Sequence, residues 1–198
     1  MNKPQAEQDI KLIREIMERS AKYTHFTGLS GVLSGIAALV GTYATYWIYV
    51  NVSLADQNKW SLVTWLVVFI FAISEDFMLA GRNARKQGTT IWNPVGFQII
   101  KAVFPGVFIA FVISLVALVD GAVDAIPGVL ALGYGAALCS AGLFSIKEVW
   151  TYGIIQLITG TIALFFMSRV PYSLYALALS FGVYQIIFGI WIAVKYHR

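Results

Sequence analysis

Charged residues are scarce in this chain. Only 12% of its 198 residues are Asp, Glu, Lys or Arg, whereas 59% are hydrophobic, and the mean hydropathy is +0.74. A soluble domain of this length cannot hide so much apolar surface from water. A soluble helical bundle would also need polar stripes along its helices, and the long apolar stretches carry almost none. The composition therefore excludes an ordinary soluble domain and favours a protein that crosses a membrane several times.

The chain also has few residues that carry chemistry. It contains two histidines and a single cysteine, Cys139. The motifs H-E-x-x-H, C-x-x-C and G-x-S-x-G do not occur, and no phosphate-binding or dinucleotide-binding glycine motif is present. A metal-dependent hydrolase within the membrane would need several His and carboxylate ligands that converge on one site. We therefore expect no catalysis, no metal and no cofactor.

Six apolar stretches are long enough, or nearly so, to cross a bilayer. A helix rises about 1.5 Å per residue, so about 20 apolar residues span a hydrocarbon core of about 30 Å. We predict an all-α, polytopic membrane protein, a bundle of six transmembrane helices over residues 23–198. The predicted spans are residues 23–50, 60–80, 96–119, 125–144, 149–167 and 172–194.

Basic residues gather on one side of these spans. All but two of the 14 Lys and Arg residues, Lys59 and Arg169, precede the first span, follow the last, or flank alternate connections. Because positive residues remain in the cytoplasm, we predict that both termini are cytoplasmic. This asymmetry explains the net charge of +4 without a nucleic-acid partner, since no soluble basic face exists to bind one.

The first 22 residues are the only sizeable segment outside the spans. Ile10, Ile13 and Met17 recur at helical spacing, and Glu15 with Arg19 forms a favourable i,i+4 pair. We predict a short amphipathic cytoplasmic helix over residues 1–22. Its simpler role is an anchor in the inner leaflet, and its alternative role is a docking surface for a cytoplasmic protein.

Glycines recur at seven-residue spacing, which is two helical turns along one face. Small residues allow helices in lipid to pack closely. The predicted packing positions are Gly28, Gly31, Gly35, Gly128, Gly135, Gly153, Gly160, Gly182 and Gly189. Residues 153–160 also match 182–189 at both glycines and at a glutamine, so an alternative is that spans five and six are diverged repeats. Exposure of Gly31 and Gly35 would instead indicate a homo-oligomer.

Four ionisable residues fall within or beside the predicted spans. Glu75 and Asp76 lie near the cytoplasmic end of the second span, Lys101 near the start of the third, and His25 at the start of the first. Charges at such depth are costly unless they are paired or hydrated. We predict that Asp76 faces a helix interface, that Glu75 turns toward lipid or a basic residue, and that one of the two pairs with Lys101. Such a layer is either a structural ion pair or part of an ion or proton pathway.

Several short motifs resemble an uncharacterised family of small six-span membrane proteins of the bacterial inner membrane. They are Glu18-Arg19-Ser20, Thr27-Gly28-Leu29-Ser30-Gly31, Ala84-Arg85-Lys86-Gln87-Gly88 and Gly133-Tyr134-Gly135-Ala136-Ala137-Leu138. Spans five and six also resemble, more loosely, glycine-repeat membrane proteins linked to acid resistance. The resemblance implies a bacterial inner-membrane helical bundle and implies no activity.

Two functions from different classes follow from these observations. The first is a non-catalytic membrane protein that acts through membrane lipids or protein partners in a stress or regulatory role, and the sequence slightly favours it. The second is a small-solute, ion or proton transporter or channel that uses Glu75, Asp76 and Lys101.

Overall fold

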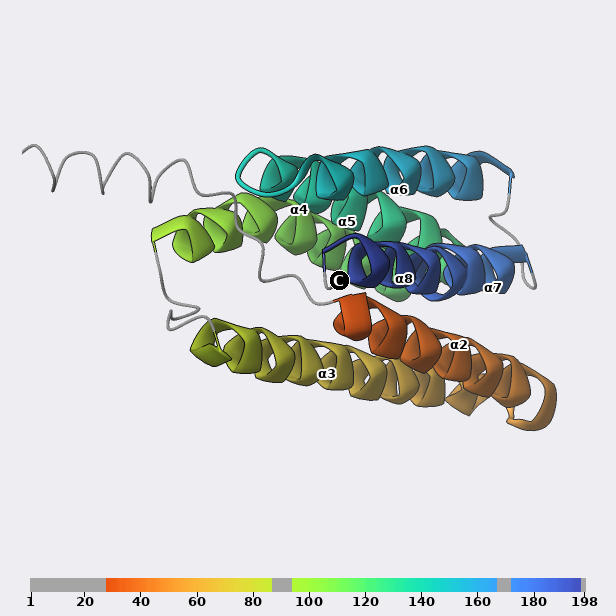
Figure 1. Cartoon of the computed structure of the whole chain (residues 1–198). Coiled ribbons are helices and arrows are strands. Elements are labelled where there is room, and N and C mark those ends of the chain that lie inside the picture. The colour runs from red at the N-terminus through yellow and green to blue at the C-terminus, as the bar shows by residue number, and fades with distance from the viewer. Residues whose placement is uncertain (1–27, 87–93, 167–171, 197–198) are drawn as a thin grey trace, which may run out of the picture.

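The computed structural model describes residues 28–86, 94–166 and 172–196, and these residues are almost entirely helical, with no strand among them. Figure 1 shows the helices lying roughly parallel to one another in a single bundle. The elements are α2 (Gly28–Asn51), α3 (Leu54–Lys86), α4 (Pro94–Val119), the short 3-10 helix η1 (Val123–Ala125), α5 (Ile126–Gly142), α6 (Lys147–Phe166), α7 (Tyr172–Leu177), the π-helix η2 (Ala178–Val183) and α8 (Tyr184–Tyr196).

Among the described residues, six helical segments are long and apolar enough to cross a membrane, which confirms the predicted number of apolar helices. Their ends differ from the prediction most clearly in α3, which has 33 residues where an apolar stretch of residues 60–80 was predicted. The helix continues because the polar residues on either side of that stretch include no proline to end it. The predicted sixth helix is continuous in space but consists of α7, η2 and α8.

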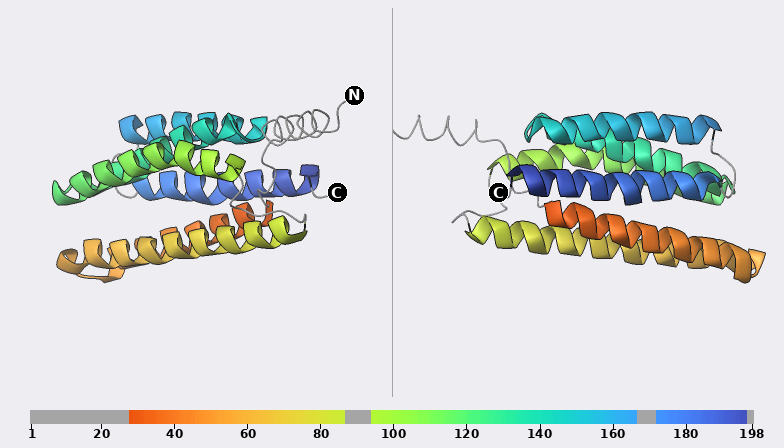
Figure 2. Two further views of the ribbon diagram at one scale, coloured as in Figure 1. Left: turned by 90° about the vertical axis from the view of Figure 1, so that its left-hand side faces the viewer. Right: turned by 45° about the vertical axis from the view of Figure 1, so that its right-hand side comes forward.

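Two helices, α2 and α5, organise the packing. Among the described elements, α2 contacts α3 and the α7–η2–α8 segment, whereas α5 contacts α4 and α6. The outer helices α3 and α4 each pack mainly on one neighbour, and Figure 2 shows α3 along the lower edge of the bundle with α4 above it. Much of the surface of these two helices is therefore apolar and exposed.

Glycines lie at the closest contacts between helices. A Cβ atom added to Gly189 of α8 would lie 2.6 Å from the carbonyl oxygen of Gly28, and one added to Gly35 of α2 would lie 2.8 Å from that of Gly182. The same pattern joins α5 to α6. A Cβ at Gly160 would lie 2.9 Å from the carbonyl oxygen of Gly128, and one at Gly135 would lie 2.8 Å from that of Gly153.

Each seven-residue glycine pair therefore meets a second such pair on an antiparallel neighbour. Two helices can approach this closely at two points only if small residues recur at the same interval on both. This geometry is a sufficient reason for the shared spacing of all four glycine pairs. Gly31 also contacts Gly189, so the glycine face of α2 is buried within the chain and is not free for a second copy.

We predict that Gly135→Leu destabilises the bundle. The side chain would collide with the backbone nitrogen of Leu157, which lies 2.8 Å from an added Cβ, so α5 and α6 would have to separate. Overpacking of this kind costs about 1–3 kcal/mol. Unfolding of the purified protein in detergent measures the loss. Ala136→Leu, at an exposed neighbouring position, is the control, and equal stability of the two variants would contradict the prediction.

Candidate functional site

Glu75 is a carboxylate buried between two helices. It lies on α3, its residue is 5% exposed, and its Oε1 accepts a hydrogen bond of 2.6 Å from the hydroxyl of Ser34 on α2. Its Oε2 is buried and has no hydrogen-bond partner. Glu75 therefore faces the α2–α3 interface, and the prediction that it turns toward lipid is wrong.

Asp76 is the exposed member of the pair. Its carboxylate accepts a hydrogen bond from the side chain of Ser30, one turn before Ser34 on α2. The carboxylates of Glu75 and Asp76 are therefore both held by hydroxyls from one stripe of α2. That stripe continues to Thr45, whose hydroxyl accepts a bond of 3.0 Å from the indole of Trp65.

Lys101 does not join this site. It is exposed on α4, a helix that packs mainly on α5 rather than on α3. Among the described residues no ion pair connects Lys101 to Glu75 or Asp76, and the one ion pair recorded there joins Glu148 to Lys195. His25, the fourth predicted residue, lies outside the described residues, as does the predicted helix over residues 1–22.

A buried carboxylate without a cation is costly in its ionised form. Removing a carboxylate from water costs several kcal/mol unless an opposite charge and further hydrogen bonds compensate. Glu75 has one hydroxyl donor and a second oxygen without a partner. Binding a proton removes the charge and with it most of this cost.

The donor set is a poor one for metals. Divalent cations such as Ca²⁺ take six to eight oxygen ligands, and both α2 hydroxyls are already used as donors to carboxylates. In the part of the chain that the structure describes, no three His, Cys, Asp or Glu side chains gather as metal ligands.

Comparison with known proteins supplies no further guide. No family model, curated protein or solved structure matches the chain.

A second polar site, entirely uncharged, lies in the interior between α6 and the α7–η2–α8 segment. Gln156 of α6 is fully buried. Its Nε2 donates to the carbonyl oxygen of Ser180 at 2.9 Å and to the hydroxyl of Tyr152 at 2.7 Å. Its Oε1 accepts from the hydroxyl of Ser180. Every hydrogen-bonding atom of the amide group is thus engaged at one point of the π-helix η2.

The polar cluster extends from Tyr152 to α8 and α5. The Tyr152 hydroxyl donates to Oε1 of Gln185 at 2.6 Å, and Nε2 of Gln185 donates to the hydroxyl of Tyr134 at 3.3 Å. The matched glutamines Gln156 and Gln185 thus bond to neighbouring helices, as buried glutamines in membrane helices do. Neither Ser180 nor the π-helix was predicted, because a single serine in an apolar run gives no signal of irregular backbone.

One end of the bundle carries most of its basic residues. This basic end contains the last turn of α3, the first turns of α4 and α6, and the last turn of α8. There Glu148 of α6, whose side chain is 2% exposed, pairs with Lys195 of α8. The Lys195 ammonium also lies 5.6 Å from the ring centre of Trp191. This ion pair joins α6 to α8, two of the helices that also contribute to the polar cluster.

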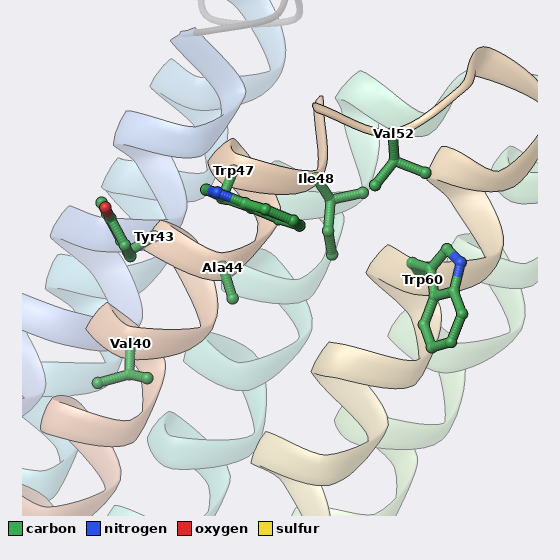
Figure 3. Close-up of a pocket in the computed structure, with 7 residues that line it drawn as sticks. All are labelled: Val40, Tyr43, Ala44, Trp47, Ile48, Val52 and Trp60. Carbon is green, nitrogen blue, oxygen red and sulfur yellow. The ribbon is translucent and has the colours of Figure 1, made fainter. Parts of the chain in front are cut away.

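An open apolar pocket of about 530 Å³ lies at the opposite end of the α2–α3 hairpin. Figure 3 shows Trp47 and Ile48 of α2 and Trp60 of α3 among its lining residues. Its lining begins at Val40, more than one helical turn beyond Ser34. The pocket therefore belongs to the end of the hairpin and does not reach the carboxylates.

We predict that Gln156→Leu destabilises the protein by about 1–3 kcal/mol. The Tyr152 hydroxyl would keep its bond to Gln185, and the Ser180 carbonyl would keep its contact with the Tyr152 hydroxyl. The Ser180 hydroxyl would lose its partner in a buried place, and one unsatisfied polar group costs about 1–3 kcal/mol. Unfolding in detergent measures the change. Thr159→Val is the matched control on α6, because the Thr159 hydroxyl bonds only to Ile155 of its own helix; a similar loss in both variants would refute the prediction.

Proposed function

We propose that the chain is a multi-pass membrane protein of the transport class, in which the Glu75–Asp76 pair exchanges protons with the solvent as part of the working cycle. The ends of the chain lie in the cytoplasm of a bacterium, and the six helices cross its inner membrane. Support for this orientation comes from the described basic residues, of which Arg82, Arg85, Lys147 and Lys195 belong to the basic end and Lys59 to the other. The bacterial assignment depends on the resemblance described above.

The observation that carries this proposal is the buried oxygen of Glu75 that has no hydrogen-bond partner. A helix that must only pack in lipid gains nothing from a carboxylate in its interface, because an apolar residue of the same size is cheaper. Intramembrane carboxylates that face the bundle interior are typical of proton pathways. Asp76 is the next residue in the chain, and in this proposal it receives the proton from Glu75 and passes it toward the basic end.

We expect the purified protein in proteoliposomes to show a transient charge displacement after a jump in proton concentration. Glu75→Gln should reduce its amplitude at least tenfold, because a neutral amide binds no proton at this site. Asp76→Asn should slow the transient while a signal remains. Electrophysiology on a solid-supported membrane measures both quantities, with jumps in Na⁺ and K⁺ as tests of the other monovalent cations.

Asp120→Asn is the control for this experiment, since Asp120 is an exposed carboxylate just after the end of α4. A wild-type protein that gives no transient with any of the three cations would overturn the proposal. The same conclusion follows if Glu75→Gln and Asp120→Asn retain the wild-type amplitude.

A second candidate is a non-catalytic membrane protein that acts through lipids or protein partners. The observation that favours it is the exposure of α3 and α4, each of which packs mainly on one neighbour. Deleting residues 1–20 should then abolish capture of a cytoplasmic partner while leaving membrane insertion intact. An unchanged set of captured proteins would count against this candidate.

A further inference from the structure

The helix α2 has two neighbouring faces that contact different parts of the bundle. Ser30 and Ser34 hold the carboxylates of α3. Gly31 and Gly35, each the next residue in the chain, contact α8 and η2. Consecutive helix residues point about 100° apart, so α2 separates the two sites by the width of one helix.

The contact of α2 with the π-helix includes a close approach of the two backbones. A Cβ atom on Gly35 would lie 2.8 Å from the carbonyl oxygen of Gly182, within η2, and 3.0 Å from the backbone nitrogen of Ile186, just after it. Gly182 in turn faces the side chain of Leu39 on α2. With no side chain at Gly35 to yield, a shift of α2 is transmitted directly to η2.

The opposite side of η2 is held by α6. The carbonyl and hydroxyl of Ser180 both bond to Gln156. The π-helix therefore lies between the glycine face of α2 and the polar cluster of α6, and an unbroken series of contacts leads from Glu75 through Ser34, Gly35 and Gly182 to Ser180.

We propose that binding of a proton at Glu75 is coupled, through α2, to a rearrangement of the π-helical segment Ala178–Val183 that turns α7 relative to α8. This inference takes from the proposed function only the premise that Glu75 exchanges a proton. The element that responds is the π-helix η2, and the path from Glu75 to η2 passes through α2.

A π-helix is suited to this role because it has a ready alternative. It contains one residue more per turn than an α-helix, and such segments are frequent at functional sites. If η2 converts to α-helix, the chain on one side of it rotates by about one residue, roughly 100°. The Ser180 carbonyl then leaves Gln156, and α7 presents a different face to α5 and α6.

In the part of the chain that the structure describes, few other titratable groups face Glu75. On its own helix the nearest is Asp76, followed toward the basic end by Arg82 and Arg85, which are exposed. On α2, the helix against which α3 packs, the residues that hold the carboxylates are the serines Ser30 and Ser34. Tyr134 of α5 interacts electrostatically with Asp76. A pH response that disappears in Glu75→Gln is therefore assigned to Glu75 itself.

Distances between spin labels test the proposal in the full-length protein reconstituted in lipid nanodiscs. Cys139→Ser removes the native thiol, and cysteines at the exposed positions Thr161 of α6 and Tyr175 of α7 carry the labels. Double electron–electron resonance is recorded in acidic and in alkaline buffer. We expect a second distance population in alkaline buffer, and we expect Glu75→Gln to retain the acidic distribution in both.

Labels at Ile155 of α6 and Ile190 of α8, which are also exposed, provide the control. Their distance should stay constant, because α8 follows η2 and keeps its glycine contacts with α2. Ser34→Ala, which removes the hydroxyl bonded to Glu75, should shift the pH midpoint of the change and provides a second variant if Glu75→Gln does not fold.

The two proposals fail in different ways. A 161–175 distance that is the same in both buffers, in a protein whose charge displacement still depends on Glu75, overturns the coupling and leaves the proton site in place. A pH-dependent distance change that persists in Glu75→Gln, or an unshifted midpoint in Ser34→Ala, also overturns it. Absence of the Glu75-dependent charge displacement itself overturns the proposed function.

Discussion

The close approach of helix backbones at paired glycines is the constraint on which the rest of the structure depends. In lipid no hydrophobic force drives helices together, so contact area and close packing must hold them. Here α2 meets the η2–α8 segment, and α5 meets α6, at two glycine contacts each. These contacts fix the relative height and rotation of both pairs. The α2–α3 hairpin, in which Ser34 meets Glu75, has a close contact of its own, since a Cβ atom on Gly41 would lie 2.8 Å from the side chain of Val68.

The two polar sites differ in how completely their hydrogen bonds are satisfied. The uncharged cluster around Gln156 uses each atom of the amide group, which is the condition under which a buried polar network stabilises a single conformation. Glu75 is the opposite case, since one of its oxygens has no partner. The cluster around Gln156 therefore holds its helices in one arrangement, whereas the site around Glu75 is able to change.

Much of the fold could be predicted from the sequence, because apolar length and glycine spacing are local signals. The six apolar helices and the glutamine contacts followed from them. The side on which Glu75 lies could not be predicted in this way. Its neighbours one turn away, Phe71 and Leu79, are more apolar than the residues that share a face with Asp76. The position of Glu75 is decided by the pair of serines on α2. Their alignment with Glu75 and Asp76 depends on how α2 and α3 are placed along each other in the hairpin, and no local sequence pattern encodes this.

The partner predicted for the carboxylates failed for a similar reason. Lys101 lies close to Asp76 along the sequence, and neighbouring spans often pack together. In the structure α4 turns to α5 through Gly106 and Gly133, so adjacency in the chain does not become adjacency in space. The π-helix also had no sequence signal, since it results from how η2 fits between α2 and α6.

The length of α3 has a consequence for the membrane around it. A helix of 33 residues extends about 50 Å, whereas the hydrocarbon core is about 30 Å thick. The apolar stretch of residues 60–80 extends about 30 Å, so the polar residues at both ends of α3 extend beyond the hydrocarbon core. Because α3 packs mainly on α2, it is comparatively free to tilt, and tilt is the usual response when the bilayer becomes thinner than the apolar stretch. Any such tilt moves Glu75 and Asp76 relative to the serines of α2, which makes bilayer thickness a physical variable acting directly on the carboxylate pair.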